Sequence, residues 1–203
     1  NLYRPGRHVT PYGQDVGAHP LKEIMESLRV TARYDARRQA ITEHNERRGR
    51  MIKGLALTPV KFGISFTAKH LNQAGALVNL YQDGSVQVNH GGTEMGQGLH
   101  TKIQGIVSRV LHLSSDQIRV TATNTDKVPN TSPTAASSGT DLNGMAAARA
   151  AETLLSRLME HAEKDLGALE PGLHDGWLVS GGERVMSFKA LVDSAYRARI
   201  SLS

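Results

Sequence analysis

The stretch from Gly91 to Lys102 combines four glycines with polar side chains, a composition typical of a binding loop. Glycines let backbone N–H groups approach a bound group in conformations that other residues avoid. Apolar residues recur at helical spacing directly afterwards, so the loop is expected to lead into a helix: Ile103, Ile106, Val107, Val110 and Leu111. Free N–H groups and the macrodipole at a helix N-terminus favour an anion such as phosphate. The stretch therefore predicts a site for a phosphate-bearing ligand.

A tight connection between a strand and a helix, without any ligand, explains the same glycines. The stretch also matches neither of the common nucleotide motifs. Gly96 and Gly98 fit the first two glycines of the dinucleotide fingerprint, but the third would fall at Thr101, and the Lys-Ser/Thr pair of the P-loop is absent from the stretch. Spacing alone leaves both a binding loop and a simple turn open.

A second irregular segment, residues 123–138, is rich in Thr, Ser, Asn and Pro. It is followed by Thr140 and Asp141, which are good capping residues for an alanine-rich helix from Met145 to about Glu163. A second helix N-terminus is thus expected beside the first. The two loops could together hold one phosphate-bearing ligand.

The elements that must position these loops can be predicted as well. Asp83-Gly84, between alternating apolar residues from Ala76 to Asn89, predicts a hairpin that leads directly into the first loop. Further along the chain, the pattern predicts a strand at residues 118–122, a hairpin at 177–186, a short helix capped by Ser187 and a strand beginning at 200.

The first third of the chain has a different character. Residues 1–19 are rich in Pro and Gly and predict an irregular leader; because they begin without Met, we expect a segment of a longer polypeptide. From Pro20 the apolar spacing predicts one long amphipathic helix to about residues 47–49; a coiled coil is the alternative, but the apolar stripe fades after Ile41. Apolar residues alternate with other residues at 52–66, which predicts one strand, or two strands broken at a proline.

These elements indicate an α+β fold, with helices packed on antiparallel or mixed sheet in a body spanning residues 20–203. Composition excludes several classes of function. The net charge is +5, but basic and acidic residues are interleaved, which indicates a solvated face rather than a nucleic-acid surface. No apolar run is long enough for a membrane span, and the polar start is unlike a signal peptide. The absence of cysteine excludes disulfides and thiolate metal ligands and fits a reducing compartment.

Three blocks of the sequence resemble a known family. They are residues 61–67 with Leu71–Ala76, Gly92–Lys102, and residues 128–137. In order and spacing they resemble the molybdenum hydroxylases of the xanthine dehydrogenase/aldehyde oxidase family, and within it the xanthine dehydrogenases most. The resemblance implies that residues 1–203 are a fragment of the molybdopterin-binding region.

The resemblance also implies roles for single residues. Met95, Gly96, Gln97 and Gly98 match the loop that lines the molybdopterin, while Ser137 and Thr140 match positions that help to hold the pterin and its phosphate. Ala136 matches an alanine close to the molybdenum, although it is no side-chain ligand. Phe66 matches a phenylalanine that stacks on the purine, and Thr67 a threonine that can hydrogen-bond it; a buried strand residue is the alternative for Phe66. Gly139 departs from the family, which often has serine there.

The family activity implied is the hydroxylation of hypoxanthine and xanthine to urate in cytoplasmic purine catabolism, with electrons leaving through iron–sulfur clusters and FAD. Those groups belong to other domains or subunits, and the catalytic glutamate lies near the end of the family polypeptide, outside this chain. We therefore expect no catalytic residue here and an inactive isolated chain. The alternative is a binding module for a phosphate-bearing ligand such as a nucleotide, without redox chemistry.

Overall fold

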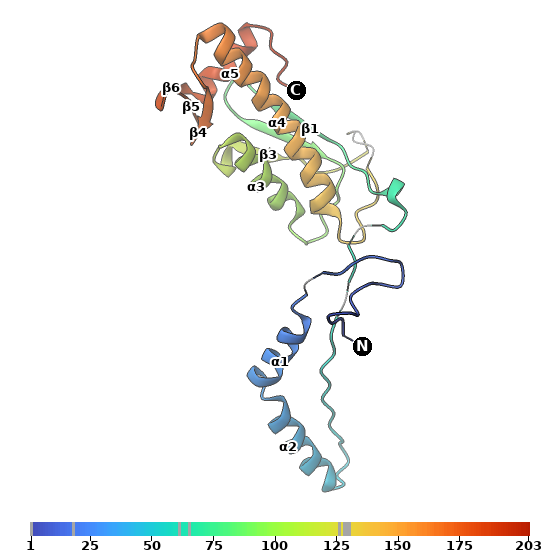
Figure 1. Ribbon diagram of the computed structural model, residues 1–203. Helices are drawn as coiled ribbons and strands as arrows, with labels where there is room; N and C mark the ends of the chain where they lie inside the picture. The colour runs from blue at the N-terminus through green and yellow to red at the C-terminus, as the bar shows by residue number, and fades with distance from the viewer. Residues whose placement is uncertain (1, 18, 61, 65, 126, 128–130) are drawn as a thin grey trace. The chain divides into compact units, whose positions relative to one another are not determined.

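The computed structural model describes residues 2–17, 19–60, 62–64, 66–125, 127 and 131–203 of the chain (Figure 1). The chain divides into two compact units, residues 1–62 and 63–203. Parts of two blocks that carry the family resemblance, residues 61, 65 and 128–130, lie outside the described residues.

The first unit contains two helices, α1 (Leu21–Thr31) and α2 (Tyr34–Glu46), so the prediction of one long helix is wrong. The chain breaks at Arg33, whose φ of 48° lies in the left-handed region and interrupts the helical hydrogen bonds. The guanidinium of Arg29 in the last turn of α1 pairs with the carboxylate of Asp35 in the first turn of α2 at 3.0 Å. This ion pair spans the break. Before α1, the described residues form isolated β-bridges between Arg4 and Arg7 and between Val9 and Asp15.

The prediction of a strand at residues 52–66 is also wrong for its described part, which contains no strand. The backbone of this segment is bonded instead to side chains of α2. Asn45 accepts from the N–H of Lys53 at 3.0 Å and donates to its carbonyl at 2.9 Å, and Arg38 donates to the carbonyl of Leu55 at 3.0 Å. Apolar residues such as Met51 and Val60 are left exposed. Alternation of apolar and polar residues is therefore not sufficient to form a strand where side chains of a helix supply the hydrogen-bond partners of the backbone.

The second unit is built on a three-stranded mixed sheet in the order β1–β2–β3. The strands β1 (Ala76–Leu80) and β2 (Val86–His90) form the predicted antiparallel hairpin. The strand β3 (Ile118–Val120) pairs in parallel with β2 and confirms the predicted short strand. A parallel neighbour requires a crossover. Helix α3 (Leu99–Leu111), confirmed at its predicted place, and the short 3₁₀ helix η2 (Ser115–Gln117) form this crossover.

Helices α3 and α4 (Gly139–Leu166) pack against each other and against the sheet, as Figure 1 shows. Small residues on α4 permit this close approach, since a Cβ added at Gly144 would lie 2.7 Å from Ile106 Cδ1. The core between these elements is fully buried and includes Val78, Val88, Ile103, Val107, Leu111, Ala147, Ala151, Leu154 and Leu158. The α+β prediction is therefore confirmed, with helices on a mixed sheet.

Helix α4 begins at Gly139, earlier than predicted, so Thr140 and Asp141 lie inside its first turn and the prediction that they cap it is wrong. The N-cap residue is Ser138, and no side chain among the described residues caps this end. The uncapped first turn leaves backbone donors available at the start of the longest described helix.

A second, antiparallel sheet follows α4 in the order β4–β5–β6. The strands β5 (Trp177–Ser180) and β6 (Glu183–Ser187) confirm the predicted hairpin, while β4 (Gly172–His174) was not predicted. Ser187 caps α5 (Phe188–Arg197) as predicted, accepting from the N–H of Ala190. The final residues form no strand, although the carbonyl of Leu202 accepts from the N–H of Leu80 at 3.0 Å.

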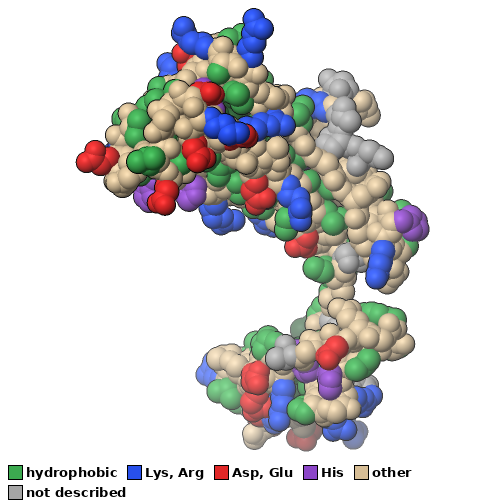
Figure 2. Space-filling view, turned by 45° about the horizontal axis from the view of Figure 1, so that its top comes forward, with side chains coloured by type: hydrophobic (Ala, Val, Ile, Leu, Met, Phe, Trp, Pro, Cys, Tyr) green, Lys and Arg blue, Asp and Glu red, His purple; other side chains and the backbone are tan. Residues whose placement is uncertain are grey.

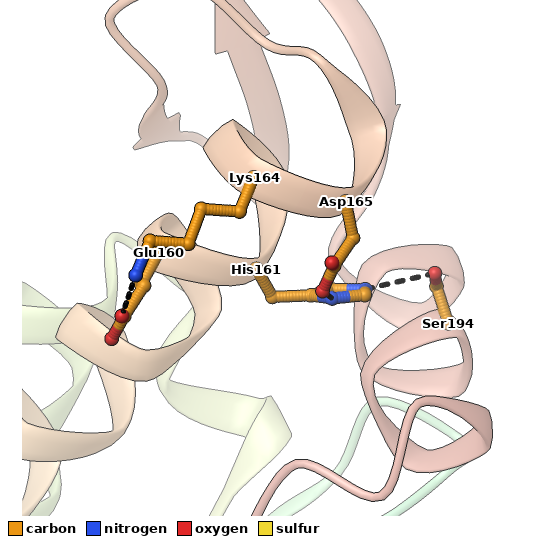
Figure 3. A network of polar contacts seen from close by, with 5 residues as sticks. All are labelled: Glu160, His161, Lys164, Asp165 and Ser194. Carbon is orange, nitrogen blue, oxygen red and sulfur yellow. Dashed lines mark hydrogen bonds and ion pairs between the residues drawn. The ribbon is translucent and has the colours of Figure 1, made fainter.

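A buried polar network joins the far end of α4 to α5 (Figure 3). His161 is 3% exposed; its Nδ1 lies 2.6 Å from the carboxylate of Asp165 and its Nε2 lies 3.0 Å from the hydroxyl of Ser194. The arrangement resembles a hydrolase triad in its order of groups. Ser194, however, lies inside a helix, where backbone N–H groups are used by helical bonds and cannot form an oxyanion hole. The network is a structural connection between the two helices.

None of the helices in the described residues is both long and apolar enough to cross a membrane. On the face drawn in Figure 2, basic and acidic side chains are interspersed and form no continuous basic patch. This distribution agrees with the charge pattern of the sequence.

Candidate functional site

The two loops of interest leave neighbouring parallel strands at the same edge of the sheet. The glycine loop, residues 91–98, follows the carboxyl end of β2, and the segment 121–138 follows the carboxyl end of β3. In open sheets with parallel strands, ligands bind at this edge because the loops converge there. The parallel pairing of β2 with β3 therefore brings together two segments that are distant in sequence.

The glycine loop has a defined hydrogen-bonded shape. Gly96 and Gly98 have φ values of 97° and 75°, which favour glycine. The side chain of Gln97 bonds back to the loop: its amide donates to the carbonyl of Thr93 at 2.8 Å and accepts from the N–H of Met95 at 2.6 Å. These bonds fix the turn and leave the side chain of Met95 66% exposed.

The carboxylate of Glu94 accepts from the backbone N–H groups that open α3. It lies 2.8 Å from the nitrogen of Gly96, 3.0 Å from that of Gly98 and 3.1 Å from that of His100. The backbone bond from His100, followed by those from Gly98 and Gly96, lowers the pKa of Glu94 from 4.5 to about 2. The expectation that this helix N-terminus is free for a ligand anion is therefore wrong. An internal carboxylate already takes these donors.

The uncapped start of α4 faces a cavity of about 350 Å³, within the usual size of small-molecule sites. Both loops line this cavity, through Met95, Gln97, Leu99, Lys102, Thr134, Ala135, Ser137, Gly139 and Thr140. Backbone donors at the helix start and the ammonium of Lys102 make this wall favourable for an anion. The residues present thus fit a ligand that carries a phosphate.

Most of the residues singled out in the sequence are brought together here. Met95, Gln97, Ser137 and Thr140 line the cavity, and Gly96 and Gly98 lie in the same loop. The lining residues that were not predicted as site residues include Lys102 and Thr134. The signal for Lys102 was its place in the first turn after the glycine loop, and Thr134 lay within the third block of the resemblance.

Ala136 lies between two lining residues in a backbone conformation that is unusual for its type. Its φ is 51°, and that of Ser137 is 54°. Two consecutive residues other than glycine in the left-handed region are costly, and such conformations concentrate at binding and catalytic sites. The strain marks this turn as one whose shape is imposed by its surroundings.

Phe66 and Thr67 do not line the cavity. Phe66 is half-buried and Thr67 is exposed, both just before the 3₁₀ helix η1 (Lys69–Leu71). The side chain of Asn72 holds Phe66 at both backbone groups, accepting from its N–H at 2.9 Å and donating to its carbonyl at 2.7 Å. Asn72 thereby fixes the position of the backbone at Phe66.

The segment that carries Phe66 is attached to the loop after β3. The N–H of Ser132 donates to the carbonyl of Gln73 at 3.1 Å, and the hydroxyl of Thr131 donates to the same carbonyl at 3.2 Å. The hydroxyl of Ser132 also donates to the carbonyl of Leu71. Hydrogen bonds to main-chain oxygens therefore connect residues 66–73 with the segment that forms the cavity wall.

The two histidines beside the glycine loop pack against each other. The rings of His90 and His100 meet edge to face with centroids 5.2 Å apart, and His90 Nδ1 accepts from the N–H of Gly92 at 3.0 Å. Burial, followed by the neighbouring His100, lowers the pKa of His90 from 6.5 to about 4. No cluster of His, Cys, Asp or Glu among the described residues could hold a metal ion. The two rings thus pack within the structure beside the glycine loop.

Proteins of known activity resemble this chain along almost all of its length. It is 42% identical over 190 residues to the xanthine dehydrogenase/oxidase of Gallus gallus, which covers 94% of this chain. It is 41% identical over 203 residues to the xanthine dehydrogenase of Drosophila pseudoobscura pseudoobscura. The chain spans about 14% of the length of each relative. The resemblance to molybdenum hydroxylases is thus confirmed.

Solved structures agree on the fold. Quinoline 2-oxidoreductase from Pseudomonas putida 86 superposes with a TM-score of 0.79 at 21% identity, over 98% of this chain and 27% of that one. Residues 27–203 match the model of the molybdopterin cofactor-binding domain. The cavity that both loops form therefore lies in a domain of known type: the chain belongs to the molybdopterin cofactor-binding domain family.

Proposed function

We propose that this chain supplies part of the molybdopterin and purine site of a xanthine dehydrogenase. The observation that carries the proposal is the cavity shared by the glycine loop and the start of α4, because its walls come from two of the three blocks that resemble the family. The names of the relatives from Gallus gallus and Drosophila support the substrate class. Hypoxanthine and xanthine are the proposed substrates.

On this proposal, the two loops hold opposite parts of the cofactor. Met95 and Gln97, with Gly96 and Gly98 shaping their turn, contact the pterin. Ser137 and Thr140 offer hydroxyl groups from the opposite wall. The start of α4, which is uncapped, would hold the phosphate, because backbone donors and Lys102 favour negative charge there. The donors at the start of α3 are not available for it, since Glu94 uses them.

The substrate is assigned to the segment before η1. Phe66 stacks on the purine ring and Thr67 hydrogen-bonds its edge, a pairing that suits a flat heteroaromatic substrate. Ala136 would lie close to the metal of the bound cofactor. Asn72 supports this assignment because it fixes the backbone of Phe66.

The bound molybdenum cofactor supplies the hydroxylation chemistry, while the residues of this chain bind and orient it. We propose that residues 1–203 work within one larger molybdopterin-binding domain of a longer enzyme. The catalytic glutamate, the iron–sulfur clusters and FAD are then on other segments, and the isolated chain is inactive. The cysteine-free sequence fits a reducing compartment. We propose a cytoplasmic location for the enzyme and a place in purine catabolism for its reaction.

The deciding experiment measures the molybdenum-to-protein ratio of the full-length enzyme, made in a host that synthesises molybdopterin. Gln97→Ala should lower this ratio, because it removes a cavity-lining side chain that also braces the loop. Gln39→Ala is the matched control, since Gln39 is an exposed residue of α2 bonded only to Glu43 among the contacts described. Absence of molybdenum from the unaltered enzyme would refute the proposal. Retention of a plain nucleotide would favour a phosphate-binding module instead.

A further inference from the structure

Glu94 stands out within the glycine loop because its carboxylate points back into the loop that carries it. Its Oε1 accepts from the N–H groups of Gly96 and Gly98, and its Oε2 accepts from that of His100. The loop from residue 94 to residue 100 thus closes around one carboxylate. These are donors that a helix N-terminus offers to an external anion in other proteins.

The position of this carboxylate decides the shape of the cavity wall. Gly96 and Gly98 both adopt φ values above 70°, which is one of several conformations open to glycine. The bonds to Glu94 fix both peptides, and the residues between and before them, Met95 and Gln97, line the cavity. Glu94 therefore fixes the part of the loop whose side chains line the cavity.

We propose that Glu94 is a positioning residue of the cofactor site: its carboxylate acts as a built-in anion that holds the glycine loop ready for the cofactor and leaves the cofactor's phosphate to the start of α4. This inference rests on the proposed function. The charge of Glu94 is matched by backbone dipoles and by no cationic side chain in the contacts described for it.

The protonation state of Glu94 supports this role. Because the loop N–H groups lower its pKa from 4.5 to about 2, the carboxylate is ionised at every physiological pH. The stabilisation that it gives is complete above pH 4.5 and is lost as the pH falls through about 2. With its three bonds to backbone donors, this carboxylate is also poorly suited to accept a proton from a substrate.

The test uses the full-length enzyme and two substitutions. Glu94→Ala leaves the N–H groups of Gly96, Gly98 and His100 without their carboxylate acceptor. Glu94→Gln keeps the shape of the side chain but replaces one acceptor oxygen by a donor. Glu152→Gln, on an exposed part of α4, controls for the loss of a negative charge. The readouts are the molybdenum content and the rate of molybdenum loss from the purified enzyme, with circular dichroism to verify folding.

We expect Glu94→Ala to release molybdenum about tenfold faster or to contain about tenfold less, as for the loss of hydrogen bonds to a charged group. Glu94→Gln should lie between it and the unaltered enzyme. Added formate should slow the loss in Glu94→Ala by occupying the emptied donors, whereas chloride at the same ionic strength should not. A purely structural side chain would give no such response to a small carboxylate.

Unchanged molybdenum content and release in both variants would overturn the inference and leave the proposed function intact. Faster release that formate does not slow more than chloride would also overturn it, since the carboxylate would then act only through folding. If Glu94→Ala does not fold, the content and release rate of Glu94→Gln decide. Absence of molybdenum from the unaltered enzyme would refute the proposed function itself.

Discussion

Thr93 and Thr134 are joined by a direct hydrogen bond although they lie 41 positions apart in the chain. The backbone N–H of Thr93, at the base of the glycine loop, donates to Thr134 Oγ1 at 2.7 Å. This bond is a direct connection between the two walls that the proposed cofactor would contact. Removal of the Thr134 hydroxyl therefore tests how the two walls are held together while the size of the lining side chain stays the same.

Replacing Thr134 by Val should loosen the site without changing the size of the side chain. The N–H of Thr93 loses its acceptor, which costs about 1 kcal/mol, and the two walls lose their connection. We expect a lower molybdenum content in the full-length enzyme, with Thr134→Ser close to the unaltered protein. Thr153→Val is the control because Thr153 bonds only within α4 in the contacts described. Equal metal content in Thr134→Val and the control would contradict this assignment.

Two glycine substitutions should have opposite effects on stability. A Cβ at Gly92 would lie 2.6 Å from Leu99 Cδ2 and 2.9 Å from Asn143 Nδ2, so Gly92→Ala should destabilise the chain by about 1–3 kcal/mol. A Cβ at Gly105, inside α3, would meet nothing within 4 Å. Gly105→Ala should therefore stabilise by about 0.5–1 kcal/mol through helix propensity. Urea unfolding of chain 1–203 measures both, and similar values for the two variants would contradict the packing described.

The connection between α4 and α5 predicts a marked cost for loss of His161. In His161→Phe, the hydroxyl of Ser194 loses its partner, and we expect about 1–3 kcal/mol of destabilisation. The neighbouring ion pair of Lys164 with Glu160, drawn in Figure 3, is exposed, and Lys164→Ala should cost little stability because solvent screens the pair. Denaturant unfolding distinguishes the two. A cost for Lys164→Ala as large as that for His161→Phe would contradict the role of the buried network.

The buried His90 predicts a loss of stability in mild acid. Its pKa is lowered from 6.5 to about 4 in the folded chain, so the unfolded state takes up a proton first as the pH falls. Stability should decrease from about pH 6.5 to about pH 4, by about 3 kcal/mol at most, and this contribution should then level off. His90→Asn retains an acceptor for the N–H of Gly92 and should remove this dependence. An unchanged pH profile in the variant would contradict the assignment.

Local signals in the sequence were sufficient to predict several helices and strands. Asp83-Gly84 determined the β1–β2 hairpin, and Ser187 determined the start of α5, because each acts through neighbours a few residues away. The break at Arg33 has no such signal, since arginine is an ordinary helix residue and the left-handed conformation there is accompanied by the Arg29–Asp35 pair. Residues 52–60 alternate like a strand, but only the fold shows that Asn45 and Arg38 are their partners.

The site was predictable in its parts but not in its electrostatics. Glycine content and the three blocks pointed to Met95, Gln97, Ser137 and Thr140, which meet at one cavity. The sequence could not show which helix start remains free. That depends on the side chain of Glu94 turning back to residues two, four and six positions ahead, a contact that no spacing rule indicates. Thr134 was likewise missed because its bond to the first loop is purely tertiary.

The attachment of residues 66–73 has a consequence for how such a site can diversify. Thr131 and Ser132 hold this segment through the main-chain oxygens of Leu71 and Gln73, and every amino acid supplies such an oxygen. Side chains at positions 66–70 can therefore be exchanged while the anchoring bonds remain. The walls assigned to the cofactor come from other segments. On the proposed assignment of Phe66 and Thr67 to the substrate, substrate preference and cofactor retention can thus evolve independently on this framework.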